Sequence, residues 1–143
     1  MFSDVETWTG AFIWQLIGPE QLVGQMVTAG MSFSRQLDLL TSLFRYRFSD
    51  ASLRKSLESL VKRISELEEK RNRVLHSSWL LQSSDPSEAT RFKITAKRKK
   101  GLVHDREVVK PEELDAIAKG FEQVLSELST FMIPLVADLR YGK

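Results

Sequence analysis

Apolar residues recur at three- and four-residue steps through most of the chain, which is the spacing of amphipathic helices. The first such stretch follows Ser3, which pairs with Glu6 in the pattern of a capping box, and its apolar positions continue to Leu16. Gly18-Pro19 then breaks the pattern. Pro19 is suited to open a short second helix, which the sequence predicts to run to about Thr28.

Two more helices follow. A third helix is expected after Ser32 or Ser34, since either serine can cap it. The longest periodic stretch begins after Ser49 or Asp50 and reaches about Leu81 without a Gly or Pro. At 1.5 Å per residue this predicts a helix of roughly 48 Å. Its first half is clearly amphipathic, with an apolar line formed by Leu53, Leu57, Leu60, Ile64 and Leu67.

The pattern changes after a polar loop at residues 83–89. Apolar and polar residues then alternate, and Lys100-Gly101 supplies a turn, so the sequence predicts a β-hairpin at about 90–109. Pro111 followed by two glutamates is a good start for a last helix. Pro134 is expected to kink or end that helix.

Composition narrows the function classes. The chain has 143 residues, 42% of them hydrophobic and 28% charged, which is typical of one globular domain and not of a disordered or fibrous protein. It has no Cys, so disulfides, thiolate metal sites and a cysteine nucleophile are excluded. His104 and Asp105 offer two adjacent metal ligands without a third, so we expect neither a metal site nor a cofactor.

Positive charge is concentrated in one place. Residues 91–100 carry six basic side chains and no acid, whereas the net charge of the whole chain is only +2. The other 133 residues therefore have a net charge of −4. A local cationic strip can hold a polyanion at a chosen point of the surface.

The second half of the long predicted helix places a cation among apolar residues. On a helical wheel, Arg71 falls at the same angle as Leu53 in the apolar stripe. A guanidinium does not lose its charge, so a buried Arg71 requires a carboxylate, an anionic ligand or carbonyl oxygens nearby. Glu68 and Glu6 are the candidate carboxylates. Asn72 and His76 lie four positions apart, side by side at one edge of the stripe.

Arg71-Asn72-Arg73-Val74-Leu75-His76 resembles the hallmark of HEPN (higher eukaryotes and prokaryotes nucleotide-binding) domains. In that hallmark Arg, a polar residue, a spacer and His lie late in a long helix. Similar short proteins also have a Glu in the first helix, a Ser-Phe-Ser before the third, a Trp after the His and a basic hairpin before the final helix. The residues in those places here are Glu6, Ser32-Phe33-Ser34, Trp79 and the strip at 91–100.

The resemblance implies an all-α fold, a HEPN-like bundle of four to five helices, one of them very long, with a small β-hairpin before the last helix. The bundle would be a single domain over residues 1–143 that forms a homodimer and brings two copies of the motif together across a cleft. In active members of the family, this cleft is a metal-independent endoribonuclease site. Such proteins act in toxin, defence or stress systems.

This resemblance assigns roles to individual residues. His76 would move protons as the ribose 2′-hydroxyl attacks the phosphate, and Arg71 would stabilise the charge on the phosphorane. Asn72 would orient His76 or the phosphate, and Glu6 would complete the site. The basic residues that would hold the RNA backbone without reading its sequence are Arg91, Lys93, Lys97, Arg98, Lys99 and Lys100.

A non-catalytic function accounts for the same residues. Arg71 with Glu6 or Glu68 would be a structural ion pair, and His76 an ordinary surface histidine. The cationic strip would be a solvated hairpin face that protects a strand edge. The chain would then be an interaction or nucleic-acid-binding module without turnover.

Localisation and partners follow from the same features. No stretch approaches the 18 apolar residues of a membrane-spanning helix, and no basic segment precedes a long apolar run at the N-terminus. We therefore expect a cytoplasmic protein without membrane partners. The expected partners are a second copy of the chain, RNA and an antitoxin-like protein.

Overall fold

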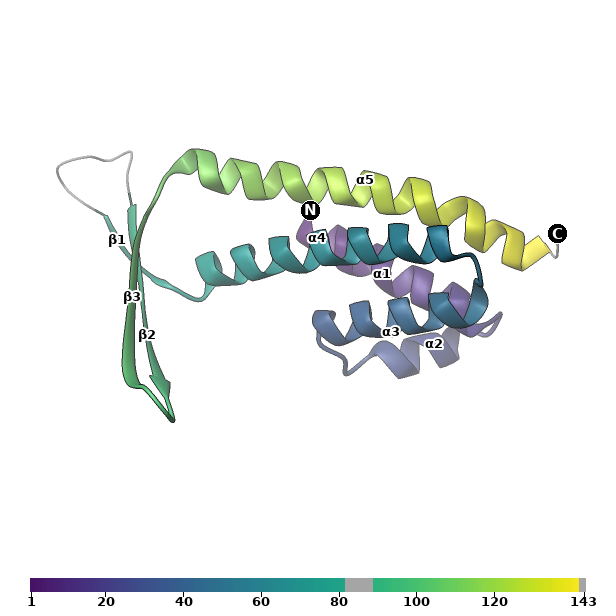
Figure 1. Ribbon diagram of the computed structural model, residues 1–143, viewed down its shortest axis with the longest axis horizontal. Helices are drawn as coiled ribbons and strands as arrows, with labels where there is room; N and C mark the ends of the chain where they lie inside the picture. The colour runs from purple at the N-terminus through teal and green to yellow at the C-terminus, as the bar shows by residue number, and fades with distance from the viewer. Residues whose placement is uncertain (82–88, 142–143) are drawn as a thin grey trace. The chain divides into compact units, whose positions relative to one another are not determined.

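The computed structural model describes residues 1–81 and 89–141 (Figure 1). The predicted polar loop at 83–89 lies outside these residues apart from Ala89. The elements in chain order are α1 (Phe2–Ile17), α2 (Gln21–Thr28), α3 (Phe33–Arg47), α4 (Ala51–Leu75), β1 (Ser78–Leu81), β2 (Ala89–Lys97), β3 (Gly101–Val109) and α5 (Pro111–Tyr141). They divide into two compact units, one formed by Met1–Glu66 with the chain from Gly120 onward, the other by Leu67–Lys119.

The first unit is helical and contains the apolar core. Its helices are α1, α2 and α3, the first part of α4 and the greater part of α5. Each of the longer helices contributes one apolar stripe, as the sequence periodicity predicts. The fully buried members of these stripes include Ile13, Leu16, Leu37, Leu40, Phe44, Leu57, Ile64, Leu128 and Met132.

Helix starts are set by capping side chains at two of the predicted positions. Ser32 Oγ accepts a hydrogen bond from the backbone N–H of Arg35 (3.4 Å), and Asp50 Oδ1 accepts one from the N–H of Leu53 (2.9 Å). The predicted capping box between Ser3 and Glu6 is wrong. Helix α1 begins at Phe2, so Ser3 already lies inside the first turn, where its hydroxyl is not in the N-cap position.

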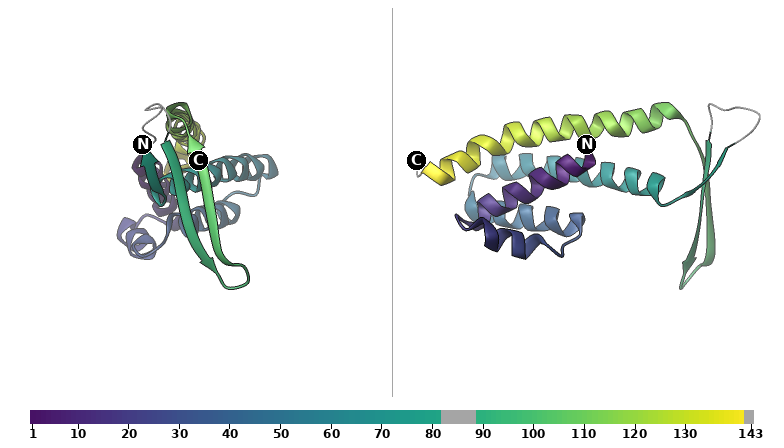
Figure 2. Two further views of the ribbon diagram at one scale, coloured as in Figure 1. Left: turned by 90° about the vertical axis from the view of Figure 1, so that its left-hand side faces the viewer. Right: turned by 180° about the vertical axis from the view of Figure 1, so that it is seen from behind.

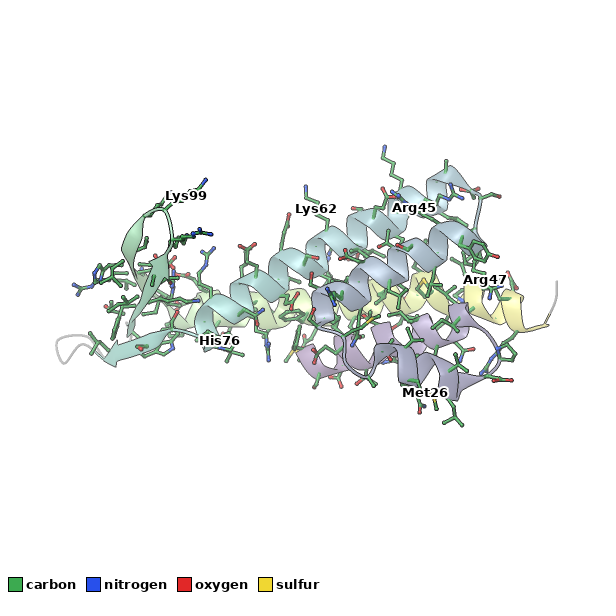
Figure 3. The ribbon with its side chains drawn as sticks, turned by 90° about the horizontal axis from the view of Figure 1, so that it is seen from below. Met26, Arg45, Arg47, Lys62, His76 and Lys99 are labelled. Carbon is green, nitrogen blue, oxygen red and sulfur yellow. The ribbon has the colours of Figure 1, made fainter. Side chains whose placement is uncertain are left out.

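Helix α2 packs against α1 through a close backbone approach. A Cβ built on Gly24 would lie 2.9 Å from Trp14 Cα, so only glycine allows this contact. Trp14 Nε1 donates a hydrogen bond to Thr28 Oγ1 at 2.9 Å. Because α2 contacts α1 through Gly24 and Thr28, its apolar residues Leu22 and Met26 face solvent. Figure 3 shows the Met26 side chain pointing outward.

The sequence predicts that Pro134 kinks or ends the last helix. Helix α5 does not end there but continues to Tyr141. Proline removes one helical hydrogen bond and clashes with the preceding turn, which kinks a helix without necessarily ending it. Met132 and Leu128 are buried just before it. Packing of this turn against the core therefore compensates for the lost bond.

The second unit contains a three-stranded antiparallel sheet in the order β1-β2-β3 (Figure 2). The expected all-α, HEPN-like bundle with only a small hairpin is therefore wrong, although the described residues form five helices. The hairpin itself, β2 with β3, is where the sequence placed it. The additional strand is β1, whose residues 78–81 pair with residues 92–89 of β2 and had been assigned to the long helix.

The long helix stops at Leu75, six residues before its predicted end. Two side chains satisfy carbonyls of its last turn. Ser77 Oγ donates to Arg73 O (2.5 Å), and Trp79 Nε1 donates to Val74 O (3.2 Å). These bonds occupy acceptors that a continuing helix would have used for its own backbone, and the chain then enters β1.

Candidate functional site

The β2–β3 hairpin forms a two-stranded ribbon that ends in a cationic turn. Lys97 is paired with Gly101, and the backbone N–H of Lys100 donates to Lys97 O at 3.1 Å. Residues 98–100 therefore form a three-residue loop, closed by Gly101 at a φ of 67°. That left-handed conformation favours glycine, which explains why the turn predicted at Lys100-Gly101 forms there.

Arg91 differs from the rest of the predicted RNA-binding strip. Its side chain is only 2% exposed, and its Nε and Nη2 donate to Glu107 Oε2 at 2.8 and 2.5 Å. Nη2 also lies 3.0 Å from Asp105 Oδ2, and Nη1 lies 3.4 Å from Ser77 Oγ. Burial lowers the pKa of Arg91, but the hydrogen bonds to Glu107 and Asp105 more than offset this, so its pKa is raised. Arg91 is thus a permanently charged structural residue that links β2, β3 and the segment between α4 and β1.

The other five basic residues of the strip are all exposed: Lys93, Lys97, Arg98, Lys99 and Lys100. Within residues 1–81 and 89–141, none of them forms an ion pair. Lys93 is opposite Asp105 in the register, yet that carboxylate is directed to Arg91. The result is a ribbon whose two acids are both paired with one buried guanidinium, while its five exposed cations from this strip have no carboxylate partner among the described residues.

The ribbon extends beyond the three-stranded part of the sheet. Strand β1 pairs only with residues 89–92 of β2, so residues 93–97 are paired on one side only, by β3, among the described residues. At about 3.3 Å per residue, this free part is roughly 17 Å long. Figure 3 shows Lys99 at the turn of the ribbon and His76 near its base, after the end of α4.

Arg71 and Asn72 are linked by their side chains near the end of α4. Arg71 Nη1 donates a hydrogen bond to Asn72 Oδ1 at 3.1 Å, and both side chains are half-buried. The bond fixes the position of one end of the guanidinium.

His76 follows the helix and does not lie inside it. Its backbone N–H donates to Asn72 O at 3.0 Å, which completes the last helical turn, and its side chain is exposed. Asn72 thus contacts both other members of the motif, Arg71 through its side chain and His76 through its backbone.

Glu6, the fourth predicted site residue, is half-buried on α1. It belongs to the helical unit, whereas Arg71, Asn72 and His76 belong to the unit formed by Leu67–Lys119. Glu68, the other carboxylate considered for Arg71, lies in the same unit as Arg71 and is half-buried on α4.

Sequence reasoning missed the ion pairs of Arg91. A cavity of about 330 Å³ adjoins this residue, and Lys70, Arg73, Glu107 and Glu113 also line it. The pairing of Arg91 with Glu107 could have been found from the hairpin register, because a turn at residues 98–100 places residue 91 opposite residue 107.

The described part of the chain holds no group of three or more His, Cys, Asp or Glu side chains arranged for a metal.

No protein-family model, curated protein or solved structure matches the chain. Within residues 1–81 and 89–141, no helix combines the length and the apolar character needed to cross a membrane.

Proposed function

We propose that the chain binds RNA through the cationic ribbon, that is, through Lys93, Lys97, Arg98, Lys99 and Lys100. The observation that carries this proposal is the pairing of both ribbon carboxylates, Asp105 and Glu107, with Arg91. Arg91 offsets one of the two negative charges of these acids, so the five cations named above outweigh the single negative charge that remains. The ribbon therefore presents a positive field to a phosphate backbone.

The composition of the ribbon favours binding without sequence preference. Ammonium groups contact phosphate oxygens as point charges and carry no information about the bases. The described side chains of the ribbon include one aromatic residue, Phe92, which is half-buried in the sheet. Stacking on successive bases is therefore not the expected source of affinity.

A fluorescence-anisotropy titration of a labelled single-stranded RNA tests the proposal. The triple variant Lys97→Gln, Lys99→Gln and Lys100→Gln should bind about tenfold or more weakly at low salt. The matched control replaces three exposed lysines elsewhere, Lys55, Lys62 and Lys119, by Gln and makes the same change in net charge. Equal losses in the two triple variants would show that only net charge matters and would contradict a defined binding ribbon.

A second function, metal-independent RNA cleavage, is favoured by the arrangement of Arg71, Asn72 and His76. The Arg71–Asn72 hydrogen bond orients the guanidinium, and His76 is exposed immediately after the helix. The spacing of these residues resembles that of the HEPN motif. We propose on this basis that two copies of the chain form a homodimer in which the two motifs act on one RNA, and that an antitoxin-like protein restrains them.

The proposed chemistry needs only these side chains. Neutral His76 would accept the proton of the ribose 2′-hydroxyl as that oxygen attacks the adjacent phosphorus. Arg71 would stabilise the additional negative charge on the phosphorane, and the 5′-oxygen would leave with the proton that His76 returns to it. The products are a 2′,3′-cyclic phosphate and a 5′-hydroxyl.

Incubation of the protein with RNA in excess EDTA tests this second function. Cleavage that yields a 2′,3′-cyclic phosphate should be lost in His76→Ala and kept in His104→Ala, which removes the other histidine of the chain. Both variants should retain RNA binding. Cleavage that persists in His76→Ala would contradict the mechanism, and no cleavage by the unaltered protein would leave RNA binding without turnover as the function.

A further inference from the structure

The strand register separates the side chains of the sheet into two faces. Residues directly opposite each other in an antiparallel pair lie on the same face, and neighbours along a strand alternate. Arg91, Glu107 and Val109 share one face, which lines the cavity next to α4 and α5. The other face, termed here the outer face, contains the opposed pairs Phe92 with Arg106 and Ile94 with His104.

The outer face is apolar and exposed. Leu80, Ile94, Leu102 and Val108 are all placed there by the register, and their exposed fractions are 54%, 55%, 67% and 45%. Single exposed apolar residues are ordinary, but four on one face of a small sheet form a patch of the kind that marks an interaction surface.

A hollow adjoins this patch. It has a volume of about 240 Å³, and its lining residues are Leu80, Phe92, Lys93, Ile94, His104, Asp105 and Arg106. A concave apolar site flanked by donors is suited to receive one large side chain of a partner, in the manner of an interface anchor.

The charge around the patch is mainly positive, and the acid that lines the hollow, Asp105, has its carboxylate 3.0 Å from Arg91. Among the described residues, the register places no Asp or Glu on the outer face, since Asp105 and Glu107 belong to the opposite face and pair with Arg91. Arg106 lies on the outer face, and the turn at Lys97–Lys100 lies at its end. A complementary partner must therefore combine apolar side chains with carboxylates.

We propose that the outer face is a docking site for an acidic, amphipathic segment of another protein. One apolar side chain of the segment fills the hollow, further ones cover Ile94 and Leu102, and its carboxylates pair with Arg106 and with the cations of the turn. RNA does not account for this surface, because aliphatic side chains offer nothing to phosphates. A lipid bilayer accounts for the charge and apolar character but not for a hollow of side-chain size.

A binding titration with short synthetic peptides tests the proposal. The probe is a fluorescein-labelled peptide of alternating Glu and Leu, twelve residues long. An alternating Glu-Ser peptide keeps its charge without apolar groups, and an alternating Lys-Leu peptide keeps its apolar groups with the opposite charge. We expect the Glu-Leu peptide to bind at least tenfold more tightly than either of the others.

Two variants locate the binding site. Ile94→Ser with Leu102→Ser should weaken binding of the Glu-Leu peptide at least tenfold, and RNA binding should remain unchanged, which separates this proposal from the proposed RNA interface. The matched control, Leu22→Ser with Met26→Ser, changes two equally exposed apolar residues of α2 and should have no effect. Thermal melting by circular dichroism confirms that both variants are folded.

Three results would overturn the proposal. The first is equal affinity for the Glu-Leu and Glu-Ser peptides, and the second is an unchanged affinity in Ile94→Ser with Leu102→Ser. The third is a preference for vesicles of phosphatidylcholine and phosphatidylglycerol (3:1) that the same double variant abolishes, because this would identify a membrane surface as the occupant.

Discussion

The guanidinium of Arg91 on β2 and the carboxylate of Glu107 on β3 face each other across the ribbon, with Nε and Nη2 both on Oε2. Asp105 adds a second carboxylate to the same guanidinium. This arrangement determines which charged groups of the ribbon remain available to bind an external ion. Two acids and one base form an internal cluster, and the remaining bases of the ribbon stay available for an external anion.

Arg91→Ala should destabilise the sheet by about 2 kcal/mol, because it removes a buried side chain and leaves two carboxylates without their partner. The penalty is smaller than for a fully buried pair, since Asp105 and Glu107 are 53% and 42% exposed and can rehydrate. Hydrogen exchange of the β2 and β3 amides measures the effect. Lys93→Ala, on the same strand and face, should leave exchange unchanged, and equal exchange in Arg91→Ala would contradict a structural role.

Gly24→Ala should weaken the packing of α2 on α1. The added methyl group would lie 2.7–2.9 Å from atoms of Trp14, including its Cα, so the helix must move, at a cost of about 1–3 kcal/mol. Gly30→Ala is the matched control, because a Cβ there meets nothing within 4 Å. Chemical denaturation followed by tryptophan fluorescence compares the two. A stability of Gly24→Ala no lower than that of Gly30→Ala would show that α2 does not approach α1 this closely.

Thr9→Val should stabilise the helical unit by about 1 kcal/mol. The Thr9 side chain is fully buried, and its hydroxyl has no hydrogen-bond partner among the described residues. Valine has nearly the same shape and removes the unsatisfied polar atom. Differential scanning calorimetry should show a higher melting temperature. A lower one would mean that the hydroxyl is hydrogen-bonded in solution.

Glu127 should make the stability of the helical unit sensitive to acid. A hydrogen bond from Arg63, at 2.5 Å, holds the pKa of the Glu127 carboxyl below its ordinary value. A lowered folded-state pKa contributes stability that is present above the unfolded-state pKa and lost as the pH falls through the folded-state pKa. Both side chains are more than a third exposed, so the contribution is about 0.5 kcal/mol or less.

The measurement is thermal unfolding between pH 3 and pH 7 of the unaltered protein and of Glu127→Gln. The difference in melting temperature should be largest at pH 7 and should shrink as the pH falls below about 4.5, the ordinary value of this carboxyl. A difference that stays constant over this range would show that the Arg63–Glu127 pair does not form.

Apolar periodicity predicted most of the fold because it reports directly which faces are buried. The stripes of α1, α3 and α5 and the hairpin follow from it, whereas the caps at Ser32 and Asp50 were each one of two candidate residues. The end of α4 did not follow, because residues 76–81 are compatible with a helical period. Their strand conformation depends on pairing with β2 and on side-chain hydrogen bonds to the last helical carbonyls. Hydrophobic periodicity reports neither of these interactions.

The candidate site was predictable in part. The cationic strip was found as a cluster in the sequence, but Arg91 was counted with the exposed residues although it is buried. The hairpin register, once fixed by the turn at residues 98–100, would have assigned Arg91 to Glu107. The Arg71–Asn72 hydrogen bond and the exposed position of His76 needed coordinates, because helical angles alone placed His76 inside a helix that ends before it.

The salt dependence of RNA binding tests the central claim most directly. If Lys93, Lys97, Arg98, Lys99 and Lys100 all contact phosphates, the slope of log K against log salt for a single-stranded RNA should be about −3.5. Replacing Lys97, Lys99 and Lys100 by Gln should flatten the slope by about 2, and replacing Lys55, Lys62 and Lys119 should leave it unchanged. The same slope in both triple variants, or affinity that does not depend on salt, would contradict RNA binding by the ribbon.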